Sequence, residues 1–236
     1  MKKFASVISM LLICSMALTA CGSNGGDKST GGSTQQPGTS QGAASSQGAA
    51  STGDSSGYTF RTSADNKVVT ENGTFTKENI EGPVLITSIG QSADVSMLDA
   101  LMKKVGADYT FNATASADDV ANYKTVIIAC GASSKGLGAA GISQEDELAR
   151  ANAIAQTVKD NGITVIAAHL GGASRRGALS DQFNDIALGV ANYVMVVEEG
   201  NDDGKFTDAA TDKGVPITLL HSIADAITPL TELFGA

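Results

Sequence analysis

Five short apolar runs follow one another from residue 83 onward, and they constrain the fold more than any other feature of the sequence. Each run is too short for a core helix and too uniformly apolar for a strand with one face in water, so each is typical of a parallel strand buried on both faces. A weaker sixth strand is predicted at residues 107–114. The five runs are PVLITSIG (83–90), KTVIIACG (124–131), ITVIAAHL (163–170), NYVMVVEEG (192–200) and VPITLLHS (215–222).

The segments between these runs have apolar residues at helical spacing. Helices are predicted at residues 92–106 and 143–162, each with a serine that can cap its first turn and a glycine that can end it. Two further helices are predicted in the C-terminal part, one beginning at Ser180-Asp181 and the last beginning at Ser222.

The alternation of strands and helices predicts an α/β fold. We expect a three-layer, doubly wound, mostly parallel sheet of about six strands, which is Rossmann-like. Ahead of it, KVVTENGTFT (67–76) could form an N-terminal edge hairpin that turns at Asn72-Gly73.

The N-terminus has the pattern of a secretory signal peptide. Lys2 and Lys3 precede an apolar run that is too short for a membrane-spanning helix. The run ends in Leu18-Thr19-Ala20-Cys21, which resembles the lipobox of bacterial lipoproteins. The resemblance implies cleavage after residue 20 and acylation of Cys21, so the bilayer is an expected partner through this lipid. The alternative is an ordinary signal peptide followed by an incidental cysteine.

A low-complexity segment separates this N-terminus from the folded part. Residues 22–57 are mostly Gly, Ser, Thr, Gln and Ala, and they cannot bury enough apolar surface to order themselves. We therefore predict three parts: a signal peptide (1–20), a lipidated cysteine with a disordered linker (21–57), and one domain (58–236). Long spacers of this kind resemble those of Gram-positive surface lipoproteins, which implies an extracytoplasmic location.

Charge and cysteine content exclude several classes of function. The chain has 25 acidic and 16 basic residues, so nucleic acid is not an expected partner. Of its three cysteines, Cys14 lies in the predicted signal peptide and Cys21 in the lipobox, which leaves Cys130 without a partner for a disulfide.

The loops that follow parallel strands meet at one edge of a sheet, and open α/β folds bind ligands there. These loops contain the stretch HLGGASRRG, where two adjacent arginines stand out in an acidic chain. Guanidinium groups suit carboxylates and phosphates, so we expect a small anionic ligand. The alternative is that the arginines pair with Asp181, Asp185 or Glu198 and order a loop. The expected contacts are Gln91, Ser92, Ser133, Lys135, His169, Gly171, Gly172, Arg175 and Arg176.

Two other functions remain open from the sequence. A hydrolase or transferase could use Cys130 as nucleophile with His169 or His221 as base, because all three follow strands at this edge. A scaffold that binds another envelope protein is the third possibility.

Two motif matches fail on their details. Gly136 to Gly141 fits G-x-G-x-x-G, but it does not open directly from a strand into a helix, so no dinucleotide cofactor is expected. The Asp-rich stretch at 200–208 lacks the final glutamate of an EF-hand loop, so we interpret it as a polar turn before a short helix. The alternative is weak metal binding by Asp202, Asp203 and Asp208. We favour the polar turn and therefore expect no metal site.

The segment from Gly82 to Phe234, with HLGGASRRGALSD and GNDDGKFTD before GVPIT, resembles an uncharacterised Rossmann-like domain found in bacterial lipoproteins. This resemblance implies the fold and carries no activity. The chain differs from two-lobed transport receptors, because one sheet in a domain of this length leaves no room for a second lobe and a hinge.

Overall fold

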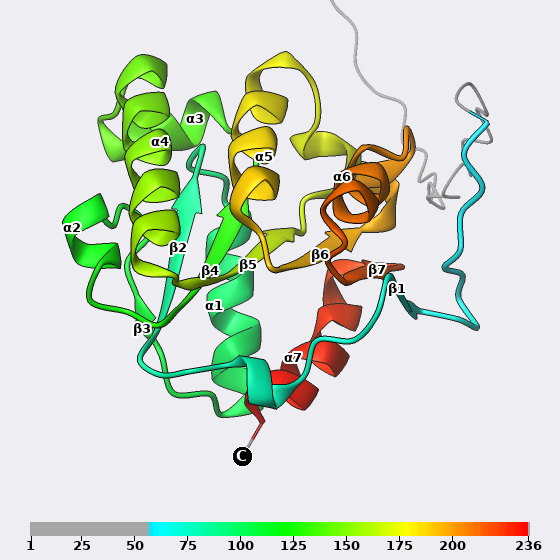
Figure 1. Cartoon of the computed structure of the whole chain (residues 1–236). Helices are drawn as coiled ribbons and strands as arrows, with labels where there is room; N and C mark the ends of the chain where they lie inside the picture. The colour runs from blue at the N-terminus through cyan, green and yellow to red at the C-terminus, as the bar shows by residue number, and fades with distance from the viewer. Residues whose placement is uncertain (1–56, 236) are drawn as a thin grey trace, which may run out of the picture. The chain divides into compact units, whose positions relative to one another are not determined.

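The computed structural model describes residues 57–235 of the chain (Figure 1). Within this range no helix is both long and apolar enough to cross a membrane. The predicted signal peptide, the acylated Cys21 and the linker as far as residue 56 lie outside the described residues.

The centre of the described part is a seven-stranded sheet with the order β1-β7-β6-β5-β4-β2-β3. All neighbouring strands are parallel except β1, which is antiparallel to β7. The predicted α/β fold is therefore confirmed, and the weak sixth run contributes a strand of only two residues. The strands are β1 (Val68–Glu71), β2 (Val84–Ile89), β3 (Thr110–Phe111), β4 (Thr125–Cys130), β5 (Thr164–His169), β6 (Tyr193–Val197) and β7 (Ile217–Leu220).

The predicted hairpin at Asn72-Gly73 is wrong, although the edge strand itself is present. Val68 pairs with Leu220 of β7, and the segment after the turn forms no strand beside β1; a 3-10 turn at Lys77–Asn79 follows instead. Instead Phe75 stacks on the ring of Tyr193, with the ring centroids 4.8 Å apart. The segment after the turn thus covers one apolar face of the sheet rather than adding a second edge strand.

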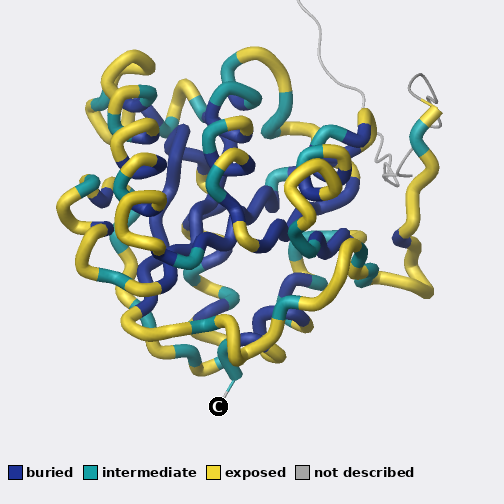
Figure 2. Tube along the Cα trace, in the orientation of Figure 1, coloured by how far each residue is buried: buried dark blue, intermediate teal, exposed yellow. Residues whose placement is uncertain are grey.

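Helices cover both faces of the sheet (Figure 1). Side chains of α1 and α7 pack with one set of strand residues, and those of α4, α5 and α6 pack with the other. Successive residues of β4 alternate between the two apolar clusters, so the strands are buried on both faces, as Figure 2 shows in dark blue. The helices are α1 (Asp94–Val105), α2 (Ala117–Val120), α3 (Ser134–Ala140), α4 (Gln144–Asn161), α5 (Ala178–Val190), α6 (Lys205–Lys213) and α7 (Ile227–Phe234).

Two of the four predicted helix starts need correction. Ser143 caps α4 by accepting a hydrogen bond from the amide of Asp146, as predicted, and Ser222 precedes a short 3-10 turn that leads into α7. Ser92 stands one residue before the cap of α1. Ser180 lies inside the first turn of α5 and does not cap it. Its hydroxyl instead accepts a hydrogen bond from the amide of Ala132 at 3.0 Å and so holds the loop after β4.

A buried ion pair fixes the loop after β2. The carboxylate of Glu147 is fully buried and accepts hydrogen bonds from the amide of Gly90 at 2.7 Å and from Arg150. Arg150 also donates to the carbonyls of Ser88 and Ala115. Burying a charge is costly unless other groups compensate it, and in this network Arg150 and the hydrogen bonds do so.

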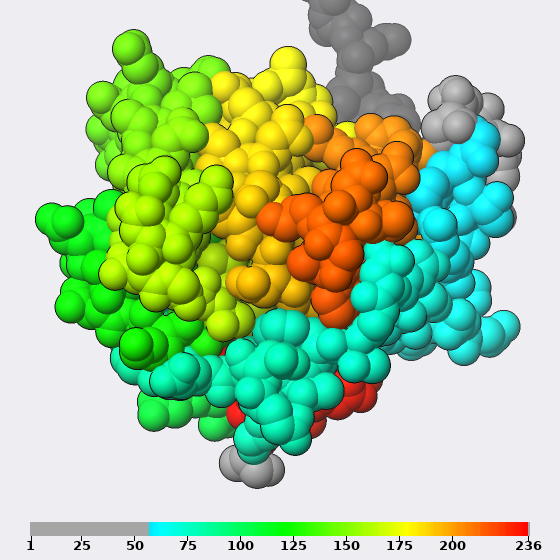
Figure 3. All heavy atoms as spheres, viewed as in Figure 1, coloured from blue at the N-terminus to red at the C-terminus, as the bar shows by residue number. Residues whose placement is uncertain are grey.

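A second buried carboxylate holds the N-terminal segment of the domain. Glu198, at the end of β6, is fully buried and accepts hydrogen bonds from the hydroxyl of Tyr58, the amide of Arg61, and the amide and hydroxyl of Thr62. In Figure 3 this N-terminal segment, coloured cyan, runs along the side of the domain. We call residues 58–62 the strap.

We predict that Arg150→Met lowers the free energy of unfolding by about 3 kcal/mol, because it leaves Glu147 buried without a cation. Urea denaturation followed by circular dichroism measures the loss. Lys103→Met is the control: Lys103 pairs with Asp99, but its side chain is 69% exposed, so its loss should stay below about 1 kcal/mol. Equal losses in the two variants would contradict the importance of the buried pair.

Candidate functional site

The predicted site residues follow the carboxyl ends of β2, β4, β5 and β7, and parallel pairing brings these ends to one edge of the sheet. We call this edge, with its loops, the carboxyl edge. It is the edge at which open α/β folds bind ligands, most often where the strand order reverses. In this sheet the order reverses between β2 and β4, because β3 lies on one side of β2 and β4 on the other.

Backbone atoms fill the space between the ends of β2 and β4, where the strand order reverses. A side chain at Gly90 would overlap the carbonyl of Gly131, and one at Gly136 would overlap the carbonyl of Gln91. Gln91 has a φ of 55°, a left-handed conformation that non-glycine residues seldom adopt. Its side-chain amide donates to the carbonyl of Ala113 and to Glu147, so it is buried in the network below the loop rather than presented to a ligand.

The other polar candidates in these first loops have local partners or stand apart. The hydroxyl of Ser133 caps α3 by accepting from the amide of Gly136 at 3.1 Å. Lys135, in the first turn of α3, is exposed. The hydroxyl of Ser92 is buried and accepts hydrogen bonds from the amide of Asp94 and from Arg175.

Arg175 lies across the first loops of the carboxyl edge. Its Nε donates to the hydroxyl of Ser92 at 3.1 Å and is 3.8 Å from Oδ2 of Asp94. Asp94 is buried in the first turn of α1, where a negative charge is favoured by the helix dipole. Arg175 and Ser92 were both predicted to contact an anionic ligand. The structure instead places a carboxylate of the chain itself, that of Asp94, beside them.

Arg176 is part of an internal ion-pair cluster. It donates to Asp181 at 2.9 Å and to Asp203 at 2.7 Å, and its guanidinium lies over the ring of Phe206. The hydrogen bonds that Arg176 donates to Asp203 and Asp181 raise its pKa despite its burial. This arrangement matches the alternative that the sequence left open, in which the arginine orders a loop by pairing with Asp181. The other two acids proposed as partners bind elsewhere: Asp185 pairs with Lys205, and Glu198 binds the strap.

Cys130 and His169 are fully buried behind these loops. Burial, together with the nearby charge of Asp94, raises the pKa of the Cys130 thiol to about 12, so the thiolate needed for nucleophilic attack does not form at neutral pH. Burial also lowers the pKa of His169, whose ring packs against Phe206 and whose Nε2 is 3.2 Å from the carbonyl of Gly172. The proposed pair of nucleophile and base is thus present in the core without access to a substrate.

An open hollow of about 360 Å³ lies at the carboxyl edge beyond these sealed loops, where β5, β6 and β7 end. Its ionisable side chains are Glu199 and His221, both exposed. His221 is the one catalytic candidate that reaches this hollow, and Gly171 and Gly172 are the two ligand candidates that line it. The full lining is Leu170, Gly171, Gly172, Val197, Glu199, His221, Ser222, Ile223 and Ala224.

Gly171 and Gly172 form one side of the hollow, which we call the glycine wall, and both positions require glycine. A Cβ at Gly171 would overlap Cγ of Arg175 and Oδ2 of Asp94. Gly172 has a φ of 57°, and a Cβ there would lie 3.0 Å from Oε2 of Glu199. The glycine pair therefore separates the sealed cluster of Arg175 and Asp94 from the open hollow.

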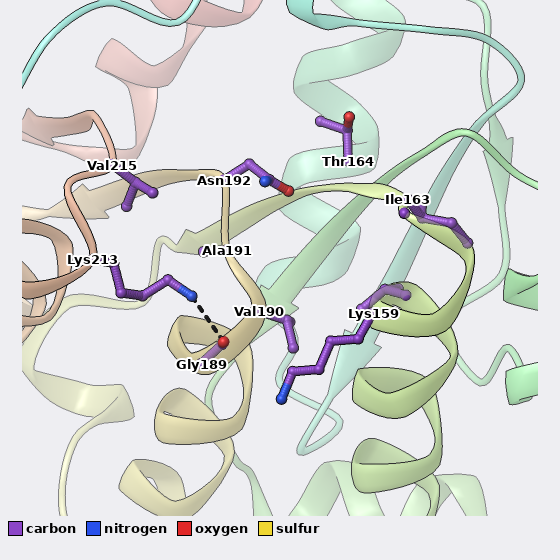
Figure 4. Close-up of a pocket in the computed structure, with 11 residues that line it drawn as sticks. Lys159, Ile163, Thr164, Gly189, Val190, Ala191, Asn192, Lys213 and Val215 are labelled. Atoms are coloured by element: carbon purple, nitrogen blue, oxygen red, sulfur yellow. Dashed lines mark hydrogen bonds between the residues drawn. The ribbon is translucent and has the colours of Figure 1, made fainter.

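A second hollow, of about 380 Å³, lies at the opposite edge of the sheet and is shown in Figure 4. Lys159 and Lys213 line it, and Lys213 donates to the carbonyl of Gly189 at the end of α5. Helices α4, α5 and α6 all end at this hollow. The partial negative charge of their C-terminal carbonyls favours the two lysines and disfavours an anion. We therefore place the candidate site at the carboxyl edge, although this hollow is slightly larger.

Metal ligands do not converge among residues 57–235, since no three His, Cys, Asp or Glu side chains form a group there. Within the Asp-rich stretch, Asp203 pairs with Arg176. The sequence places Asp94 in the loop after the first strand, but neither its pairing with Arg175 nor the role of Glu147 at this edge was predicted. Their positions in first helical turns are visible in the sequence, but their partners Arg175 and Gly90 are remote along the chain and are brought close only by the fold.

We predict that Arg176→Gln lowers the free energy of unfolding by about 2 kcal/mol at neutral pH, because hydrogen bonds to two carboxylates are lost. The hydrogen bond from Arg176 lowers the pKa of Asp203; burial opposes ionisation of Asp181, but the hydrogen bond and charge of Arg176 outweigh it and lower that pKa also. A lowered pKa stabilises the fold above the ordinary pKa, and this contribution is lost as the pH falls through the folded-state value.

The stability difference between the natural protein and Arg176→Gln should therefore shrink between about pH 5 and pH 2. Denaturant titrations across this range measure it. A difference that stays constant with pH would show that the two carboxylates do not depend on Arg176.

Three comparisons with known proteins bear on this chain. Among solved structures it is similar to a GDSL-like lipase from Bacteroides thetaiotaomicron VPI-5482, with 12% identity over 60% of this chain and 72% of that chain and a TM-score of 0.27, which is too low to support any argument about activity. No curated protein matches the sequence. A family model described as a domain of unknown function, DUF6305, matches residues 81–234, which include β2 to β7 and the whole carboxyl edge apart from the strap. The chain therefore belongs to the DUF6305 family.

Proposed function

We propose that this protein is a lipid-anchored, extracytoplasmic binding protein whose domain holds a small anionic molecule in the hollow at the carboxyl edge. The observation that carries the proposal is the hollow itself, about 360 Å³ in volume and situated where open α/β folds bind ligands. This volume is near the lower end of the range for small-molecule sites, so the ligand is a small metabolite.

The contacts proposed for the negative group are His221 and the glycine wall. The imidazole of His221 is exposed in the hollow, and the absence of side chains at Gly171 and Gly172 lets a ligand approach the backbone. Arg175 lies behind Gly171, where the carboxylate of Asp94 balances its charge. We leave Arg176 out of the proposed contacts, because its donors are engaged by Asp181, Asp203 and the carbonyl of Gly200.

The membrane anchor is proposed from the lipobox-like sequence Leu18-Thr19-Ala20-Cys21. An acylated cysteine would hold the protein at the membrane without a spanning helix. The linker over residues 22–57 would give the domain a reach of roughly 30 to 36 Å from that anchor.

A binding function fits this edge better than catalysis through Cys130 or His169, because both side chains are enclosed. A scaffold function draws on no particular feature of the described residues. We therefore propose ligand binding alone.

We predict that a screen of small carboxylates and phosphates contains compounds that raise the melting temperature of the protein. A ligand at one hundred times its Kd stabilises the fold by about 2.7 kcal/mol, which raises the melting temperature by several degrees. His221→Ala should reduce this shift to less than about half. Lys124→Ala, which removes an exposed cation at the opposite edge, should leave it unchanged. A screen without any stabilising anion would overturn the proposed function.

We also predict that the protein incorporates labelled palmitate in a bacterial host that processes lipoproteins, and that it sediments with membranes. Cys21→Ala should abolish the label and release the protein from the membrane fraction, because it removes the acylated thiol. Cys14→Ala is the control, since this cysteine lies within the predicted signal peptide. Persistent membrane association of Cys21→Ala would contradict lipid anchoring at this residue.

A further inference from the structure

The hollow at the carboxyl edge contains two ionisable side chains that the protein leaves without partners. The carboxylate of Glu199 and the imidazole of His221 both line it, and within residues 57–235 neither makes a hydrogen bond or an ion pair. Oε2 of Glu199 lies beside Gly172, at the glycine wall.

The buried and half-buried acids of this edge have partners. Glu147 has Arg150, Glu198 has the strap, and Asp181 and Asp203 have Arg176. The second histidine, His169, is buried against Phe206 and the carbonyl of Gly172. The charges that hold the loops together are thus paired with one another, whereas the lining of the hollow contains one acid and one imidazole without a partner.

The position of Glu199 is unfavourable for a simple anion. A carboxylate in the wall repels a negative ligand, and the formal net charge of the chain, −9, adds to this repulsion. A ligand that carries a positive group as well turns this repulsion into attraction. Its ammonium can pair with Glu199 while its acid group pairs with His221.

The remaining lining is aliphatic. The apolar residues of its lining include Leu170, Val197 and Ile223, and no aromatic ring for stacking belongs to that lining. Such a surface suits a short aliphatic chain, which binds by the burial of methylene groups.

We propose that the ligand is amphoteric, with an amino group and an acid group on a short aliphatic frame, as in an aliphatic amino acid. The proposal rests on the proposed function and adds the chemical class of its ligand. Glu199 recognises the ammonium, and His221 recognises the acid group.

The test compares each of L-alanine, L-valine and L-leucine with two matched analogues, the acid that lacks the amino group and the amine that lacks the carboxylate. For L-leucine these are 4-methylpentanoate and 3-methylbutylamine. Calorimetric titration of the purified protein at neutral pH should give a Kd for at least one amino acid that is about tenfold lower than for either of its analogues, a difference of about 1.4 kcal/mol.

Two substitutions in the hollow separate the recognition of the two groups. Glu199→Gln should remove the preference for the amino acid over its acid analogue, so that the two bind within about twofold. His221→Asn should weaken binding of the amino acid and of the acid while leaving that of the amine unchanged. Glu145→Gln, which changes an exposed acid in the first turn of α4, is the control and should preserve all three affinities.

The outcomes distinguish this inference from the proposed function. If the acid analogue binds as tightly as the amino acid and Glu199→Gln changes nothing, the amphoteric ligand is excluded while anion binding stands. If no amino acid in the set binds at about 10 mM but anions from the metabolite screen do, the inference is likewise overturned. If no amino acid and no anion binds, both the inference and the proposed function fail.

Discussion

Two fully buried carboxylates hold the carboxyl edge of this domain together. Glu147 accepts hydrogen bonds from the amide of Gly90 and the guanidinium of Arg150, and Glu198 accepts them from amides and hydroxyls of the strap. An unpaired charge in such positions would cost several kcal/mol, so each carboxylate requires its loops in one arrangement. The shape of the edge follows from these two requirements.

One consequence is that the candidate site does not lie where the strand order reverses. The loops after β2 and β4 are drawn against each other so closely that Gly90 and Gly136 leave no room for a side chain. Arg175 and Asp94 then fill the space beside them. The open surface is displaced toward the ends of β5, β6 and β7, where the glycine wall bounds the hollow. The paired charges hold these loops together, and we propose that the unpaired Glu199 and His221 recognise a ligand.

The sequence predicts the strands well because periodicity is local. Each of the five apolar runs contains one strand, and parallel pairing alone places their following loops on one edge. Tertiary contacts decide the rest. Phe75 stacks on Tyr193 instead of entering a hairpin, and Ser180 holds the loop after β4 instead of starting a helix. The role of Arg175 could not be read from its neighbours, since its partner Ser92 is 83 positions away.

The strap joins the predicted linker to the domain at Glu198, the residue before Glu199 of the hollow. Residues 58–62 lie outside the segment 81–234 that the family model matches, yet they supply the hydrogen bonds that Glu198 needs in the core of that segment. The folded unit of this chain therefore begins before the family model does. Glu198 is followed directly by Glu199, so the chain joins the domain at the same edge as the hollow. For a protein anchored through Cys21, this connection would put the proposed ligand site at the end of the domain to which the linker is attached.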